Sequence, residues 1–286
     1  MRIRKFQFIS DEDALEIDCM EVVPEGTIKG IVQFVHGMCE YKERYTEFME
    51  LLADHGYYCV IHDNRGHGKS IESEDDLGYF YEGGYRALIE DTHQLAMLTK
   101  DKIGKNLPYI LLGHSMGSMI VRCFLKQYDD VIDKLIVLGI PSKLPGMKPV
   151  LALTKGIGRI EGEKEHSKLL DYIVQNYMYE SWFKEEGLHS WVCSDKEVVE
   201  KYNEDPFCNY TFTIQGYVNL IQLTKQTYDK DGWEMKNPNL PIFFASGKDD
   251  PCTLSPRDYG KAVHFLKDRG YTNVSATLFH GMRHEL

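Results

Sequence analysis

Short, mostly apolar runs alternate with longer segments of helical periodicity over much of the chain. The runs are rich in Val, Ile, Leu, Phe and Tyr and predict buried strands at 29–37, 57–63, 109–115, 134–140, 240–247 and 274–281. Apolar residues spaced three to four positions apart predict helices at 45–57, 85–103, 116–129 and 256–270. This alternation predicts an α/β fold with a mostly parallel sheet covered on both faces. The stretches at 5–10 and 14–22 predict an antiparallel hairpin before it.

The alternation breaks between residues 141 and 233. This stretch has few β-branched runs and many aromatic residues, so we interpret it as a helical insertion that caps the carboxyl edge of the sheet. The core domain would then comprise 1–140 and 234–286, with the cap, or lid, at 141–233 as the place to look for substrate-binding residues. Its aromatic residues suit both a cap core and a substrate-lining surface, and the sequence leaves the two open: Tyr172, Tyr177, Tyr179, Trp182, Phe183, Trp191, Phe207, Tyr210, Phe212 and Tyr217.

Composition narrows the classes of function. The 286 residues carry a formal net charge of −11, which disfavours a nucleic-acid partner and broad adsorption to an anionic membrane, but leaves transient contact through a local patch open. No apolar run reaches the length of about 18 residues that a membrane span needs, and none near the N-terminus resembles a signal peptide. The seven scattered cysteines contain no CxxC pair, so we expect reduced thiols in a cytoplasmic protein.

The segment YILLGHSMGSMIV at 109–121 places Ser115 between two glycines, where a predicted strand meets a predicted helix. Strand, G-x-S-x-G and helix in this order form a nucleophile elbow. Gly113 and Gly117 are expected because a side chain at either position would collide where strand and helix approach. Ser115 would then project near the helix N-terminus, whose N–H groups favour developing negative charge. We predict that Ser115 is a nucleophile; a glycine-rich structural turn with an incidental serine is the alternative.

A serine at its ordinary pKa needs a general base and an acid that orients this base. In an elbow of this kind, the acid and then the histidine follow the serine along the chain. Asp249 and Asp250 follow the predicted strand at 240–247. His280 and His284 follow VSATLF, the apolar part of the predicted strand at 274–281. Both pairs lie where loops at the carboxyl edge are expected, and the chain order admits either member of each pair.

Five segments together give the chain a more specific likeness: VHGMCEYKERY at 35–45, DNRGHGKS at 63–70, GHSMGS at 113–118, SGKDDP at 246–251 and GMRHEL at 281–286. In this order they resemble the α/β-hydrolases of the monoacylglycerol lipase and lysophospholipase group (serine aminopeptidase S33-like). The resemblance implies the α/β-hydrolase fold, with Asp250, which precedes a proline, as the acid and His284 as the base. It also implies an oxyanion hole made by the backbone N–H groups of Met38 and Met116; such donors contribute roughly 3–4 kcal/mol each.

These features predict a serine ester hydrolase that works through an acyl-enzyme and requires no cofactor. The apolar cap favours an apolar acyl group, and the resemblance implies a monoacylglycerol, a lysophospholipid or a small carboxylic ester as substrate. One alternative is a peptidase or amidase, which needs a cap carboxylate for the substrate's amino group. The candidates for that carboxylate are Glu161, Glu163, Glu165, Glu180, Glu185 and Glu186. The other alternative is a non-catalytic binding protein of the same fold, which normally lacks one of the three catalytic residues.

Other polar patterns are assigned structural roles or none. GHGKS at 66–70 lacks the preceding glycine of a phosphate-binding loop, and His280 with His284 lacks a third ligand, so no metal site is predicted. Several polar residues are expected only to hold loops near the site: Glu40, Arg44, Asp63, Arg65 and His67. The sequence does not indicate the acyl length or head group of the substrate, or the oligomeric state of the protein. Members of the group usually carry one more helix after the histidine segment, and the resemblance leaves open whether the chain continues past Leu286.

Overall fold

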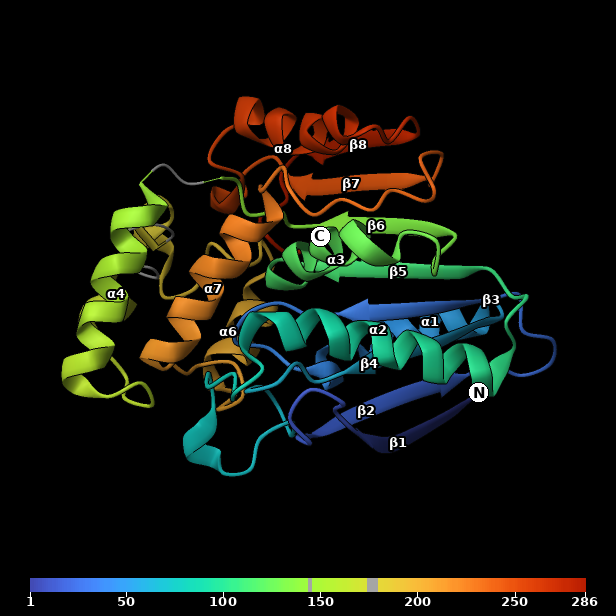
Figure 1. Cartoon of the computed structure of the whole chain (residues 1–286), viewed down its shortest axis with the longest axis horizontal. Helices are drawn as coiled ribbons and strands as arrows, with labels where there is room; N and C mark the ends of the chain where they lie inside the picture. The colour runs from blue at the N-terminus through green and yellow to red at the C-terminus, as the bar shows by residue number, and fades with distance from the viewer. Residues whose placement is uncertain (144–145, 174–179) are drawn as a thin grey trace.

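A single eight-stranded sheet runs through the computed structural model, which describes residues 1–143, 146–173 and 180–286 (Figure 1). The strand order is β1-β2-β4-β3-β5-β6-β7-β8. At one edge, β1 (Arg2–Ile9) pairs antiparallel with β2 (Glu16–Val23), which pairs antiparallel with β4 (Tyr57–His62). The remaining pairings are parallel and involve β3 (Gly30–Val35), β5 (Tyr109–His114), β6 (Lys134–Leu138), β7 (Ile242–Gly247) and β8 (Val274–Phe279). The predicted strands and the mostly parallel sheet are confirmed.

Helices cover the two faces of the sheet unequally. On one face α2 (Gly84–Ile103), α3 (Met116–Tyr128) and α8 (Pro256–Arg269) enclose the larger apolar core. On the other face α1 (Thr46–Asp54), which follows a short 3-10 turn at Lys42–Tyr45, packs its Met49 into a smaller core with Phe34 of β3. Within the described residues no other helix joins this second core, and Phe243 of β7 is 38% exposed. Helices therefore lie on both faces of the sheet, as predicted, and among the described residues α1 is the helix on the second face.

The described residues between 141 and 233 contain helices and no strand. They form α4 (Met147–Glu161), α5 (Lys168–Asp171), α6 (Lys196–Glu204) and α7 (Ile214–Thr227), with 3-10 turns at Glu180–Trp182 and Lys184–Glu186. Two further 3-10 turns, at Glu74–Asp76 and Pro251–Thr253, lie outside this region. Figure 1 shows α4, α6 and α7 beyond the carboxyl ends of the parallel strands, where α7 packs against both α4 and α3. We therefore keep 141–233 as the proposed cap. Two of its aromatic residues, Tyr177 and Tyr179, lie outside the described residues.

Candidate active site

Ser115 occupies a sharp turn between β5 and α3. Its φ of +54° and ψ of −116° lie in a region that L-residues rarely adopt, and its N–H donates to the Leu138 carbonyl at 3.1 Å. A side chain at Gly113 would come within 2.4 Å of the Gly117 carbonyl oxygen, and one at Gly117 within 2.0 Å of the Val35 carbonyl oxygen. The predicted reason for both glycines is confirmed. Close packing of strand and helix thus holds the serine in a strained backbone conformation.

The structure brings together one residue from each of the two predicted acid and histidine pairs. His284 and Asp250 are both buried, and His284 Nδ1 lies 3.0 and 3.1 Å from the two carboxylate oxygens of Asp250. In contrast, Asp249 and His280 are exposed on the loops that follow β7 and β8. Only Asp250 and His284 are therefore placed to act on each other.

The surroundings of Asp250 favour its ionised form. The Ser246 hydroxyl donates to it at 2.8 Å and the backbone N–H of Cys252 at 2.9 Å. Burial raises the pKa of Asp250, but the neighbouring His284 and these two donors outweigh burial, so its pKa lies below the ordinary value of 3.8. A carboxylate accepts the proton on His284 Nδ1, which leaves Nε2 as the nitrogen with a lone pair.

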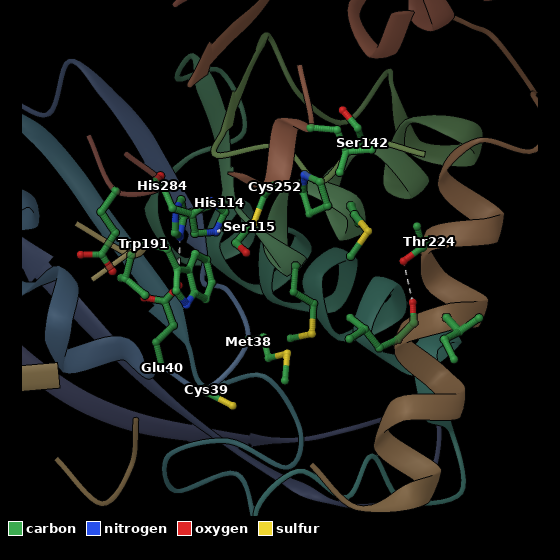
Figure 2. A pocket seen from close by; sticks show the side chains of 18 of the residues that line it. Met38, Cys39, Glu40, His114, Ser115, Ser142, Trp191, Thr224, Cys252 and His284 are labelled. Atoms are coloured by element: carbon green, nitrogen blue, oxygen red, sulfur yellow. Dashed lines mark hydrogen bonds and ion pairs between the residues drawn. The ribbon is translucent and has the colours of Figure 1, made fainter. Parts of the chain in front are cut away.

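A cavity of about 390 Å³ joins Ser115 to His284 (Figure 2). His284 Nε2 lies 4.0 Å from the sulfur of Cys252, which also lines the cavity. In the part of the chain that the structure describes, no hydrogen bond joins Nε2 to the Ser115 hydroxyl. The serine and the histidine of the described chain thus share one cavity without a hydrogen bond between them. Catalytic hydrogen bonds are often long before substrate binds, so this spacing is compatible with proton transfer in a substrate complex.

The two predicted oxyanion donors lie beside the serine. Met116 begins α3, and Met38 follows Gly37 in the loop after β3. A side chain at Gly37 would come within 2.9 Å of Ser115 Cβ, so this loop passes directly over the serine. Neither the Met38 nor the Met116 N–H takes part in a hydrogen bond among the described residues. Both side chains line the cavity together with Met119. We keep the two N–H groups as the proposed oxyanion hole.

A buried carboxylate connects the loops around the cavity. Glu40 accepts a hydrogen bond from the Gly37 N–H, lies 3.1 Å from His114 Nδ1, and pairs with Arg44 at 3.0 Å. Arg44 in turn makes two hydrogen bonds, of 2.6 and 3.0 Å, to Glu285, the residue after the proposed base. Sequence analysis assigned Glu40 and Arg44 only to loop packing. In the structure they line the cavity and connect the loop after β3 to the histidine segment.

Glu40 and His114 stabilise each other's charged forms. Burial lowers the pKa of His114, but the Glu40 carboxylate outweighs burial and raises this pKa above the ordinary value of 6.5. Burial likewise raises the pKa of Glu40, yet His114 and Arg44 bring it well below its ordinary 4.5. The folded protein therefore favours the ion pair. Sequence offers only two hints of it, the four-residue spacing of Glu40 and Arg44 and the histidine inside GHSMG.

We expect Glu40→Gln to lower the free energy of unfolding by about 3 kcal/mol near pH 5.5, because it leaves the charged, buried His114 without its carboxylate partner and removes one of the two carboxylates that pair with Arg44. The stabilisation from His114, whose pKa is raised, is full below pH 6.5 and is lost as the pH rises through its folded-state pKa. The stabilisation from Glu40, whose pKa is lowered, is full above pH 4.5 and is lost as the pH falls. Urea unfolding of both proteins between about pH 4 and 9 measures this.

The difference between wild type and Glu40→Gln should therefore be largest between these two ordinary pKa values and smaller on either side. The matched control is Glu47→Gln, because Glu47 is exposed on α1, and we expect it to change stability by less than about 0.5 kcal/mol at every pH. A Glu40→Gln effect that stays constant across this pH range would contradict the ion pair.

A segment of the proposed cap holds the loop that carries His284. The Trp191 ring lies 5.3 Å from the His284 ring between centroids, and Figure 2 shows the two side by side. The Glu285 N–H donates to the Val192 carbonyl at 2.7 Å, and Arg283 donates to further backbone carbonyls of the same segment. Among the described aromatic residues named in the sequence analysis, Trp191 is the one on the cavity wall.

Other candidates from the sequence lie away from the cavity. None of the six cap glutamates that the sequence analysis considered for an amino group lines it, within the described residues. The cavity's own carboxylates, Glu40 and Glu285, are already paired with Arg44. Asp63 is buried in an ion pair with Lys42, and the buried Arg65 pairs with Asp13 and Asp91, while His67 packs among aromatic rings. Structural roles for Asp63, Arg65 and His67 fit these contacts.

Comparisons with known proteins show the family of the chain. The sequence pattern of the family described as serine aminopeptidase, S33, matches residues 26–286. A monoglyceride lipase of Rattus norvegicus is 32% identical over 240 residues, which cover 83% of this chain and 71% of that protein. A monoacylglycerol lipase of Mycolicibacterium smegmatis is 28% identical over 195 residues, 65% of this chain and 59% of that protein.

Similarity to solved structures extends over nearly the whole chain. A carboxyl esterase from Bacillus coagulans, solved in complex with glycerol, superposes with a TM-score of 0.87 at 24% identity. The superposition covers 99% of this chain and 92% of that one. This similarity concerns the fold alone, and it establishes the α/β-hydrolase fold that the sequence predicted.

Proposed function

The chain belongs to the serine aminopeptidase S33 family and is an ester hydrolase, and we propose that it cleaves esters of apolar acyl groups through Ser115, His284 and Asp250. The observation that carries this proposal is the shared cavity: a serine on a strained elbow and a buried His–Asp pair line one apolar space. No step of the proposed reaction calls for a cofactor.

The proposed reaction has two halves. Substrate binding brings His284 Nε2 within reach of the Ser115 hydroxyl, Nε2 takes its proton, and the serine oxygen attacks the acyl carbonyl carbon. The N–H groups of Met38 and Met116 stabilise the resulting oxyanion. When the intermediate collapses, His284 gives its proton to the departing alcohol, and water then releases the acid by the same steps in reverse. Asp250 keeps Nδ1 protonated and stabilises the charged ring.

The cavity wall supports an apolar acyl group. Most of its lining is apolar, with Met119 on α3 and Leu220 and Ile221 on α7, the helix that carries Thr224 in Figure 2. Charged groups, among them Arg44, are confined to the side near the histidine segment. An apolar acyl chain on one side of Ser115 and a small polar alcohol on the other suit a monoacylglycerol, a lysophospholipid or a small carboxylic ester. Relatives named as monoglyceride lipases support the first of these.

The experiment that tests this function is hydrolysis of p-nitrophenyl esters from acetyl to palmitoyl, beside a monoacylglycerol, lysophosphatidylcholine and an aminoacyl amide. We expect kcat/KM to rise roughly fourfold per added methylene until the cavity is full, which corresponds to about 0.8 kcal/mol for each buried group. A protein that cleaves the amide and leaves every ester intact would favour the peptidase alternative.

Leu220→Trp should shorten the preferred acyl chain, because the indole fills part of the cavity beside α7. We expect kcat/KM for the longest accepted ester to fall by about fifteenfold, because the indole displaces about two methylenes of the acyl chain. The value for the acetyl ester should stay within about twofold of wild type. Lys225→Trp is the control, because Lys225 is exposed on the same helix. Equal effects on short and long esters would contradict an acyl site at α7.

We further propose transient contact between α4 and lipid surfaces. None of the described helices is long and apolar enough to cross a membrane. On α4, however, Val150, Leu153 and Ile160 are 41%, 53% and 88% exposed, and Val150 also lines the cavity. An exposed apolar stripe beside the substrate cavity suits an enzyme that takes its substrate from a lipid surface.

We also propose a cytoplasmic location, because no disulfide joins any of the seven cysteines, all of which are described.

The double variant Leu153→Asp and Ile160→Asp should weaken binding to phosphatidylcholine vesicles by at least about tenfold, because two apolar anchors become charged. Vesicle co-sedimentation measures this, and hydrolysis of a soluble acetyl ester should stay within about twofold of wild type. Leu51→Asp is the control, since Leu51 on α1 is as exposed as Leu153 and lies far from α4 in the fold. Unchanged vesicle binding in the double variant would rule out α4 as the contact.

A further inference from the structure

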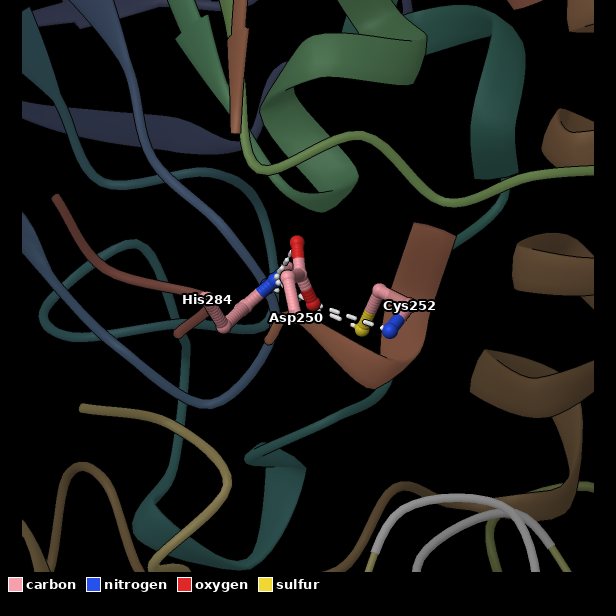
Figure 3. Close-up of side chains that lie close together, drawn as sticks. All are labelled: Asp250, Cys252 and His284. Carbon is pink, nitrogen blue, oxygen red and sulfur yellow. Dashed lines mark hydrogen bonds and ion pairs between the residues drawn. The ribbon is translucent and has the colours of Figure 1, made fainter. Parts of the chain in front are cut away.

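Three buried side chains beside the cavity bring metal-binding atoms together (Figure 3). Cys252, in the 3-10 turn after β7, places its sulfur 4.0 Å from His284 Nε2, and the ligand atoms of Asp250, Cys252 and His284 lie within 4.8 Å of one another. Cys252 and His284 are only 5% and 3% exposed, yet both line the cavity, so an ion can reach them from inside it. Sequence analysis found no third ligand for His284, because Cys252 is distant along the chain.

The geometry suits one zinc ion between sulfur and nitrogen. Zinc binds thiolate at about 2.3 Å and imidazole at about 2.0–2.1 Å, so a tetrahedral ion bridges atoms roughly 3.6 Å apart. The observed 4.0 Å between Cys252 Sγ and His284 Nε2 needs a shift of only a few tenths of an ångström. Asp250 already accepts the proton on Nδ1. A carboxylate behind the histidine in this way is the usual support of a zinc-bound imidazole, and it directs the Nε2 lone pair toward the ion.

We propose that Cys252 and His284 form an inhibitory binding site for a thiophilic divalent cation, with Zn²⁺ as its probe. The six-coordinate hydrated ion releases four waters as it becomes tetrahedral and keeps two. The Cys252 thiol releases its proton to solvent when the S–Zn bond forms, and Nε2 contributes its lone pair without losing a proton. These two waters occupy the positions that face the cavity. A metal-bound Nε2 cannot take the proton of Ser115, so occupancy blocks hydrolysis. This block rests on the proposed function, whereas the binding itself does not.

Binding is tested by calorimetric titration with ZnCl₂ in chelator-free buffer, on wild type and on Ser115→Ala, which separates binding from turnover. We expect one Zn²⁺ per chain in both proteins, and affinity reduced by at least about tenfold in Cys252→Ala and in His284→Gln. Cys39→Ala is the control, because Cys39 is a second buried thiol on the same cavity, with its sulfur directed to the Tyr210 carbonyl. Co²⁺ should show a thiolate charge-transfer band that Cys252→Ala lacks. Thermal unfolding checks that every variant is folded.

Inhibition is tested by p-nitrophenyl butyrate hydrolysis at increasing Zn²⁺, with each variant compared to its own metal-free rate. We expect inhibition that EDTA reverses, that strengthens as the pH rises because binding displaces the thiol proton, and that needs at least about tenfold more Zn²⁺ in Cys252→Ala. Wild-type Zn²⁺ affinity in Cys252→Ala, no binding to wild type, or binding without inhibition would each overturn the proposal. Cys252-dependent binding in a protein that cleaves no ester would leave the metal site standing and remove the proposed function instead.

Discussion

Replacing Ser115 with alanine is expected to lower kcat for ester hydrolysis by roughly 10⁶-fold, the scale seen when a catalytic serine is removed. The proposed acyl-enzyme forms on the Ser115 oxygen, so neither half of the reaction can proceed without it. The elbow itself should persist, because it depends on the close approach at Gly113 and Gly117. Steady-state kinetics with a p-nitrophenyl ester measure the loss, and circular dichroism checks the fold.

Two further variants show whether the effect is specific to the nucleophile. Ser142→Ala removes another hydroxyl on the same cavity wall, which donates to the Thr253 carbonyl at 2.8 Å. It should lower stability by about 1 kcal/mol and leave kcat within about threefold. Ser115→Gly should be as inactive as Ser115→Ala. Its free energy of unfolding should exceed that of wild type by about 1 kcal/mol, because glycine relieves backbone strain at a φ of +54°. A Ser115→Ala protein that keeps a tenth of wild-type activity would contradict the proposed nucleophile.

Asp250→Asn is expected to lower kcat by about 10⁴-fold, since an amide no longer holds the imidazole of His284 in the required tautomer. The neutral amide also cannot stabilise the positive charge that the His284 imidazole acquires during the reaction. Replacement of Asp250 should lower kcat far more than replacement of Asp249, because Asp249 is exposed and Asp250 is buried against His284. Steady-state kinetics of the two asparagine variants make the comparison directly.

Asp249→Asn serves as the control, with kcat expected within about twofold of wild type. The stabilisation of the folded state by Asp250, whose pKa is lowered, is present above pH 3.8 and is lost as the pH falls. Part of the acid sensitivity of the wild-type protein should therefore disappear in Asp250→Asn. A larger loss of kcat in Asp249→Asn than in Asp250→Asn would show that the acid has been assigned to the wrong residue.

Local patterns were sufficient to predict the strands, the main helices and the elbow. The apolar runs alternate with helical segments in the order that the sheet shows, and the need for Gly113 and Gly117 follows from the crowding of a strand against a helix. Chain order narrowed the acid and the base to two residues each. The selection of Asp250 and His284 came from family resemblance, and the physical basis for it, burial in mutual contact, is visible only in three dimensions.

Contacts between distant segments could not be predicted from the sequence. The sequence predicted only that Glu40 and Arg44 hold loops near the site, and nothing in it connects Arg44 with Glu285, 241 positions away. The contact of Cys252 with His284 is hidden for the same reason, because it depends on the 3-10 turn after β7. Periodicity shows that a strand is apolar but not how much of each sheet face the helices cover, so the unequal cover of the two faces could not be predicted.

The most direct test of the proposed mechanism is mass spectrometry of the protein after reaction with an alkyl fluorophosphonate, which modifies only an activated serine. We predict one adduct per chain, located on the peptide that contains Ser115, in wild type and Asp249→Asn. The adduct should form far more slowly in His284→Gln and Asp250→Asn, because both lack a functional base. Ester hydrolysis with no adduct, or with the adduct on another serine, would contradict the proposal that Ser115 is the nucleophile.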